Sequence, residues 1–186
     1  MLNGKATILC PRGKLRYAGD EARGYYYPDH LFLEREVKSA VAAFETRFEP
    51  RSAGEKYIYA GYSQGASMGA LAFAGHGELF SQLILIEGGY KDLTRGLAER
   101  YVHSGGTGAL FVCGTKACHD QAQSKLAVFK QLGLTVEVHY APGAGHRPDG
   151  AVTRALLKAL PRLLATDPRF NGLVLVNPDD TLHGNG

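Results

Sequence analysis

The stretch Gly61-Tyr62-Ser63-Gln64-Gly65 places one serine between two glycines and fits the pattern G-x-S-x-G. It follows a strand-like run and precedes a helix-like run of small residues. A serine presented on a sharp turn between a strand and a helix needs small neighbours, because its backbone is strained and larger side chains would clash. The stretch therefore predicts a nucleophile elbow with Ser63 as the nucleophile. The alternative is an ordinary glycine-rich packing turn.

A serine hydroxyl becomes a nucleophile at neutral pH only when a neighbouring base takes its proton. His146 follows a predicted strand and a glycine-rich loop and precedes a predicted helix, and the order serine before histidine suits a strand–turn–helix nucleophile. We therefore predict His146 as the base. The other histidines have weaker positions: His30, His76, His103, His119, His139 and His183.

Stabilisation of a negatively charged intermediate requires N–H donors near the serine. The first N–H groups of a helix have no partner within the helix, so the N–H of Gln64 is one predicted donor.

A carboxylate is expected to orient the imidazole of His146. Asp120 is the first acidic residue after the buried strand pattern that precedes this loop, and it also stands before a predicted helix, where aspartate is a favoured N-cap. Glu87, after the preceding strand, and Asp149, close to His146, are the alternatives. The sequence favours Asp120 as the acid and leaves the capping interpretation open.

Strand and helix patterns alternate along the chain and must position these residues. The predicted strands are Ala6–Cys10, Tyr57–Tyr62, Leu83–Ile86, Ala109–Cys113 and, as an edge strand, Thr135–Tyr140. The predicted helices are 29–48, 64–74, 92–103, 121–132 and 152–164. Strands separated by helices of this length imply a parallel sheet, which binds ligands beyond the carboxyl ends of its strands.

The expected fold class is therefore α/β, with a mostly parallel sheet of about five to six strands and helices on both faces. Residues 1–165 would form one domain, and residues 166–186 would be a C-terminal tail or add an edge strand through Leu173–Val176. Ser63, Glu87 and the loops 114–120 and 141–149 should share one edge of this sheet.

Composition narrows the classes of partner. The chain has 186 residues, 45% of them hydrophobic, and a net charge of +3, so neither nucleic acid nor a membrane surface is indicated. No apolar run is long enough for a membrane span, and the first ten residues do not read as a secretion signal. The sequence leaves the oligomeric state open.

Three cysteines do not make a disulfide framework. Cys113 and Cys118 are close enough to pair in an oxidising compartment, but we interpret the chain as a reduced, cytoplasmic protein. The Cys113-x4-Cys118-His119 segment lacks the paired ligand spacing of zinc sites, so no metal is expected.

Residues 61–68 are similar to the G-F-S-Q-G-G-x-M segment of one group of α/β-hydrolases, the phospholipase/carboxylesterase group. This group includes the acyl-protein thioesterases and relatives of dienelactone hydrolase. Cys10-Pro11-Arg12-Gly13, the aromatic stretch 24–29 and Gly145-His146 resemble further segments of the group. The resemblance covers about residues 5–165. It implies a minimal α/β-hydrolase core, a serine hydrolase for a small carboxylic ester or thioester, and no cofactor.

Two departures from the group bear on activity. The group usually has Gly-x-x-Asp at the acid, whereas Asp120 comes three residues late after Gly114. The group also has a His-Gly oxyanion loop upstream of its Pro-x-Gly segment, and this chain starts too late to contain it. If the strand predicted at 6–10 lay beside 57–62, the N–H of Arg12 or Gly13 would replace that donor. A catalytically weak or inactive binding protein is therefore the alternative function, and a peptidase ranks last.

Overall fold

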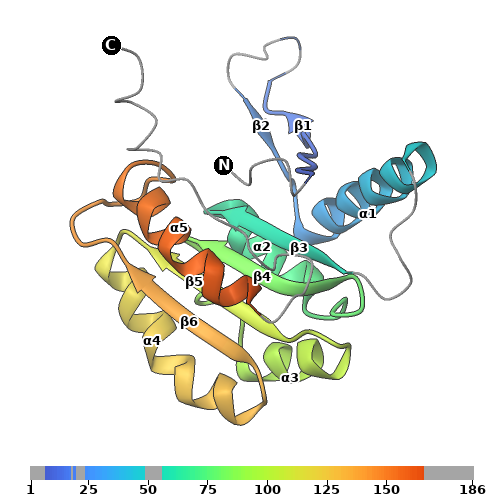
Figure 1. Ribbon diagram of the computed structural model, residues 1–186. Helices are drawn as coiled ribbons and strands as arrows, with labels where there is room; N and C mark the ends of the chain where they lie inside the picture. The colour runs from blue at the N-terminus through green and yellow to red at the C-terminus, as the bar shows by residue number, and fades with distance from the viewer. Residues whose placement is uncertain (1–6, 18, 20–23, 49–55, 166–186) are drawn as a thin grey trace, which may run out of the picture.

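The computed structural model describes residues 7–17, 19, 24–48 and 56–165, and Figure 1 shows how their elements are arranged. The strands are β1 (Lys14–Leu15), β2 (Tyr25–Tyr26), β3 (Tyr57–Tyr62), β4 (Phe80–Ile86), β5 (Gly108–Cys113) and β6 (Thr135–Tyr140). The helices are α1 (His30–Arg47), α2 (Gln64–Phe73), α3 (Arg95–His103), α4 (Lys116–Gln131) and α5 (Ala151–Leu164).

Strands β3 to β6 form a parallel sheet in the order β3-β4-β5-β6, which confirms the predicted α/β class. Because all three pairings are parallel, the carboxyl ends of the four strands lie at one edge, as the sequence predicts. Strand β6 lies at one end of this order, where the sequence placed an edge strand.

The described main sheet has four strands, fewer than the five to six expected. The fifth was expected before β3, at Ala6–Cys10, and the sixth, at Leu173–Val176, lies outside the described residues. Residues 7–10, the described part of the strand predicted at Ala6–Cys10, have no regular secondary structure. Ile8 and Leu9 are exposed, so this short apolar run is not buried in a sheet. In the described chain β3 pairs only with β4, while β1 and β2 form a separate antiparallel hairpin (Figure 1).

The sheet is covered on both faces, because alternate side chains of a strand point in opposite directions. Leu83 and Leu85 of β4 pack in the larger core cluster, together with buried residues of α1, α2, α3 and α4. Ile84 of the same strand packs in a second cluster with α5, which crosses the other face (Figure 1). Strands β4 and β5 are therefore apolar on both sides, as expected for central strands of such a sheet.

Helix α4 begins at Lys116, five residues before the predicted start at 121. Thr115 is its N-cap, and the Thr115 hydroxyl accepts a hydrogen bond from the Cys118 N–H at 3.4 Å. The prediction that Asp120 stands before the helix is wrong, because Thr115, also a favoured capping residue, ends the loop earlier.

Cys113, the last residue of β5, and Cys118, in the first turn of α4, are joined by a disulfide. Their Cα atoms lie 5.5 Å apart, within the usual range for such a bond. The expectation of reduced thiols is therefore wrong for this pair, whereas Cys10 is free and exposed.

Two further expectations concern the chain as a whole. Within the described ranges, none of the helices combines the length and the apolar character needed to cross a membrane. The tail or edge strand predicted for residues 166–186 lies outside the described residues.

Candidate active site

Ser63 lies on the sharp turn between β3 and α2 that its glycine neighbours predict. Its φ of 51° and ψ of −113° are strained for a residue with a side chain. A Cβ atom on Gly61 would lie 2.6 Å from the carbonyl carbon and oxygen of Gly65, so the strand and the helix meet where both residues lack a side chain. The Ser63 N–H donates to the Ile86 carbonyl at 2.8 Å, which ties the turn to the end of β4.

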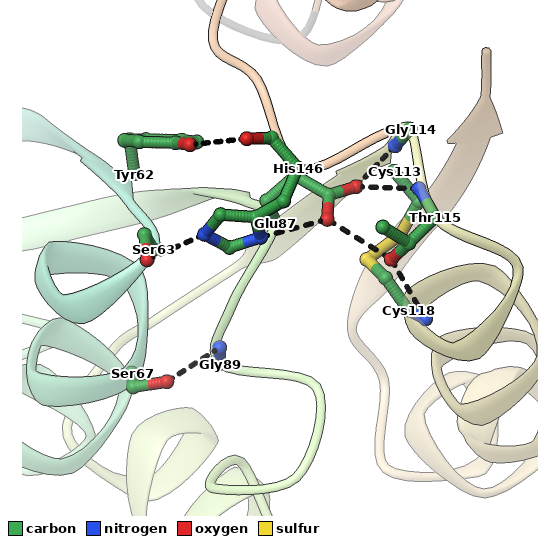
Figure 2. A network of polar contacts seen from close by, with 10 residues as sticks. All are labelled: Tyr62, Ser63, Ser67, Glu87, Gly89, Cys113, Gly114, Thr115, Cys118 and His146. Carbon is green, nitrogen blue, oxygen red and sulfur yellow. Dashed lines mark hydrogen bonds and ion pairs between the residues drawn. A yellow bond between two sulfur atoms is a disulfide. The ribbon is translucent and has the colours of Figure 1, made fainter. Parts of the chain in front are cut away.

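The structure brings the predicted nucleophile and base together (Figure 2). His146 Nε2 lies 2.7 Å from Ser63 Oγ, and His146 Nδ1 lies 3.2 Å from Glu87 Oε2. We assign the imidazole proton to Nδ1, so that Nδ1–H donates to the carboxylate and Nε2 accepts from the serine hydroxyl. The His146 side chain is half exposed, whereas that of Glu87 is 1% exposed.

The structure does not bring Asp120, the favoured acid, to His146. Its carboxylate accepts a hydrogen bond from Lys116 and lies 3.1 Å from His119 Nδ1. The hydrogen bond from Lys116 is the main cause that lowers the pKa of Asp120. The early start of α4 explains this, because it places Asp120 one turn into the helix on an exposed surface.

Asp149, the second alternative acid, pairs with Arg147 at 3.1 Å. Glu87, the first alternative, occupies the position beside the imidazole.

Helix α4 and the turn before it hold the Glu87 carboxylate. Glu87 accepts hydrogen bonds from the Gly114 N–H, from the Thr115 N–H at 2.9 Å and from the Thr115 hydroxyl at 3.0 Å (Figure 2). These donors stand at the N-terminus of α4, where the helix dipole favours a negative charge. Glu87 and Ser63 are the two described non-glycine residues with positive φ, each at 51°. Strain is therefore concentrated at the two ends of the hydrogen-bonded chain.

The loop that carries His146 is tied on both sides. The Tyr62 hydroxyl donates to the His146 carbonyl oxygen at 2.9 Å, and the two rings lie 5.2 Å apart (Figure 2). Partial burial and the nearby carboxylates raise the pKa of Tyr62, so its hydroxyl remains a donor. On the other side, the Gly145 N–H donates to the Gly114 carbonyl oxygen at 3.1 Å.

The predicted oxyanion donors are the N–H groups of Gln64, Arg12 and Gly13. Gln64 opens α2, so its N–H has no acceptor within the helix and stands next to Ser63. Arg12 and Gly13 were predicted as donors if the strand at 6–10 lay beside β3, and the described residues do not meet that condition. The Arg12 guanidinium instead lies over the Tyr25 ring at 4.8 Å.

A cavity of about 360 Å³ lies beside Ser63. Its lining residues come from the start of α2 and the segment after β4: Ser63, Gln64, Ser67, Glu87, Gly88, Gly89, Tyr90, Lys91 and Asp92. The volume is within the range of small-molecule sites.

Lys125 of α4 supports the wall of this cavity. Its ammonium group donates to the carbonyls of Tyr90, of Leu93 at 3.1 Å and of Lys91 at 3.3 Å. Burial lowers the pKa of Lys125. Helix α4 therefore holds both the acid and the segment that follows it.

A carboxylate oxygen of Glu87 and the sulfurs of Cys113 and Cys118 lie within 4.8 Å of one another. A metal would require the sulfurs as thiolates. In the structure they are bonded to each other, so this group offers only the carboxylate.

The sequence patterns did not predict that Thr115, Tyr62 and the disulfide hold the site. Two features of the sequence could have indicated them: a capping residue directly after Gly114, and the five-residue spacing of Cys113 and Cys118.

The chain was compared with known proteins. No family model matches it, and neither the curated proteins nor the solved structures give a significant match.

Proposed function

We propose that the protein is a serine hydrolase that cleaves a small carboxylic ester or thioester through an acyl-enzyme on Ser63. The observation that carries the proposal is the continuous hydrogen-bonded chain from Ser63 Oγ through His146 to Glu87, with distances of 2.7 Å and 3.2 Å. The likeness of residues 61–68 to α/β-hydrolase esterases supports an ester or thioester as the substrate.

In the first half of the reaction, Ser63 Oγ attacks the substrate carbonyl while its proton passes to His146 Nε2. Glu87 stabilises the imidazolium that forms, and the Gln64 N–H stabilises the negative oxygen. The tetrahedral intermediate then collapses. The bond from the carbonyl carbon to the leaving oxygen or sulfur breaks, and the leaving group takes the proton from His146.

In the second half, a water molecule attacks the acyl-enzyme and gives its proton to His146. The bond between the acyl carbon and Ser63 Oγ breaks, the proton returns to the serine, and the carboxylic acid leaves. The side chains themselves supply nucleophile, base and acid, so the proposed reaction uses no metal or organic cofactor.

The cytoplasmic location stays a prediction. The Cys113–Cys118 disulfide argues against it, because such bonds persist mainly in oxidising compartments.

The first test is labelling with a fluorophosphonate probe. The wild type is expected to be labelled at Ser63, and the variant Ser63→Ala is expected to lose labelling and ester turnover. Ser124→Ala, on the exposed side of α4, is the matched control and should label as the wild type does. Equal labelling of the wild type and Ser63→Ala would overturn the proposal.

A binding protein with the same scaffold is the second candidate. It is favoured by the oxyanion prediction, because donation by Arg12 or Gly13 requires a strand beside β3 that the described residues do not form. Loss of one oxyanion donor costs about 10² to 10³ in turnover. A nitrophenyl ester distinguishes the two functions: a hydrolase shows steady turnover, whereas the binding protein releases at most one nitrophenol per chain.

A further inference from the structure

Among the described residues, the hydrogen bonds to the Glu87 carboxylate other than that with His146 come from two adjacent residues, Gly114 and Thr115. The Thr115 hydroxyl donates to Glu87 and also accepts from the Cys118 N–H, so one oxygen links the acid to the first turn of α4. The position of the acid therefore depends on the conformation of this short turn.

The same turn also holds the loop of the base. The Gly114 carbonyl accepts the Gly145 N–H at 3.1 Å, one residue before His146. A Cβ atom on Gly114 would lie 2.2 Å from the Gly145 oxygen, so the two loops are in direct contact. Gly114 thus contacts the acid through its N–H and the loop of the base through its carbonyl.

The disulfide joins the two residues on either side of this turn, Cys113 before it and Cys118 in the helix after it (Figure 2). Both cysteines are fully buried. The bond spans only five positions, and a short loop restricts the unfolded chain less than a long one does. A disulfide that serves only to stabilise the fold would gain more stability from a longer loop, whereas this one constrains the residues that hold Glu87.

We propose that the Cys113–Cys118 disulfide is a positioning element of the active site, which keeps the Gly114–Thr115 turn in the conformation that aligns Glu87 and His146 with Ser63. This inference rests on the proposed hydrolase function. It predicts that loss of the disulfide slows the chemical step and that the slowing acts through Glu87. A disulfide that only stabilises the fold would lower stability when removed, and any effect on the rate would be the same with and without the Glu87 carboxylate.

The presence of the bond is measured first, by thiol titration of the unfolded, unreduced wild type. One reactive thiol, that of Cys10, is expected. Three reactive thiols would overturn the proposal.

The main experiment compares four proteins: the wild type, Cys113→Ala/Cys118→Ala, Glu87→Gln and the combination of all three substitutions. Each is tested below its melting temperature for fluorophosphonate labelling rate and for kcat and KM with a nitrophenyl ester. Removal of the disulfide should lower kcat and the labelling rate by about 10- to 100-fold with little change in KM, because small misplacements of catalytic groups are costly. In the Glu87→Gln background the further loss should be less than about twofold, because residues that act as a unit are not additive.

Tyr101→Phe is the matched control for a loss of stability. The Tyr101 hydroxyl donates to the Phe80 carbonyl at 2.9 Å, at the opposite edge of the sheet from the site. This variant should melt earlier but label at the wild-type rate.

Thr115 provides a second test if the cysteine variant does not fold. Thr115→Val removes the hydroxyl and should slow labelling by about tenfold, whereas Thr115→Ser keeps it and should restore the rate.

The outcomes separate this inference from the proposed function. A wild type that is not labelled at Ser63 overturns both. A labelled wild type whose cysteine variant labels equally fast, or slows by the same factor with and without Glu87, overturns the positioning role and leaves the hydrolase proposal intact. If the cysteine variant does not fold, equal labelling of Thr115→Val and the wild type overturns it.

Discussion

Two regions around Ser63 differ in how many contacts fix them: the acid side, which holds Glu87 and His146, and the oxyanion side, where N–H donors would stabilise a negative oxygen. On the acid side, Glu87 is buried, accepts three hydrogen bonds from the start of α4, and is flanked by a disulfide. On the oxyanion side, the described residues offer the N–H of Gln64, and the hairpin that carries Arg12 and Gly13 lies apart from the main sheet.

The difference concerns two separate requirements of the proposed chemistry. Activation of the serine needs a fixed acid and base, and those contacts are complete. Stabilisation of the negatively charged intermediate needs further donors, which raise turnover but do not decide whether the serine reacts. We therefore expect a nucleophile that reacts readily with probes and a modest rate of ester hydrolysis.

The largest expected effect is that of Glu87→Gln. An amide in place of the carboxylate cannot stabilise the imidazolium, and in a serine-histidine-aspartate triad the equivalent change from aspartate to asparagine lowers kcat by about 10⁴. Asp120→Asn is the control and should keep wild-type turnover, since Asp120 pairs with Lys116 instead. The measurement is the kcat of both folded variants with a nitrophenyl ester. A lower kcat for Asp120→Asn together with an unchanged kcat for Glu87→Gln would show that Asp120, and not Glu87, is the acid.

An intermediate effect is expected from Lys125→Met, which removes the donor to the carbonyls of Tyr90, Lys91 and Leu93. Loss of these charge-assisted bonds should lower the free energy of unfolding by about 1.5–3 kcal/mol. It should also loosen the cavity wall, so KM should rise more than kcat falls. Lys130→Met, at an exposed position of the same helix, is the control. Denaturant unfolding and ester kinetics measure both effects, and an unchanged KM would show that this wall does not contact the substrate.

The smallest effect is expected from Gly13→Ala on the oxyanion side. Gly13 has a φ of 73°, and a Cβ atom there would lie 2.7 Å from the Tyr26 carbonyl oxygen, so the change disturbs the hairpin. Turnover of a nitrophenyl ester should nevertheless change by less than about twofold, because the described donor is Gln64. A fall of about 10² to 10³ at an unchanged melting temperature would show instead that the hairpin supplies a second oxyanion donor.

The sequence by itself determined the α/β class and the parallel direction of the described strands, and it predicted the serine and the histidine that the structure brings together. These follow from local patterns: apolar runs of strand length, helices between them, and glycines at a turn that only small residues permit. The bounds of β3 and β6 are as predicted, and α2 begins at Gln64 as expected.

Only the tertiary structure decided which acid meets His146. Glu87 and Asp120 both follow strands whose ends share one edge, so sequence order ranks them poorly. The choice depends on where α4 begins. Thr115 caps the helix before Asp120, so Asp120 lies within the helix and does not reach His146. The N–H and hydroxyl of Thr115 donate to Glu87 instead. Helix starts are set by competing caps, and contacts between adjacent strand ends are non-local, so neither can be read from spacing along the chain.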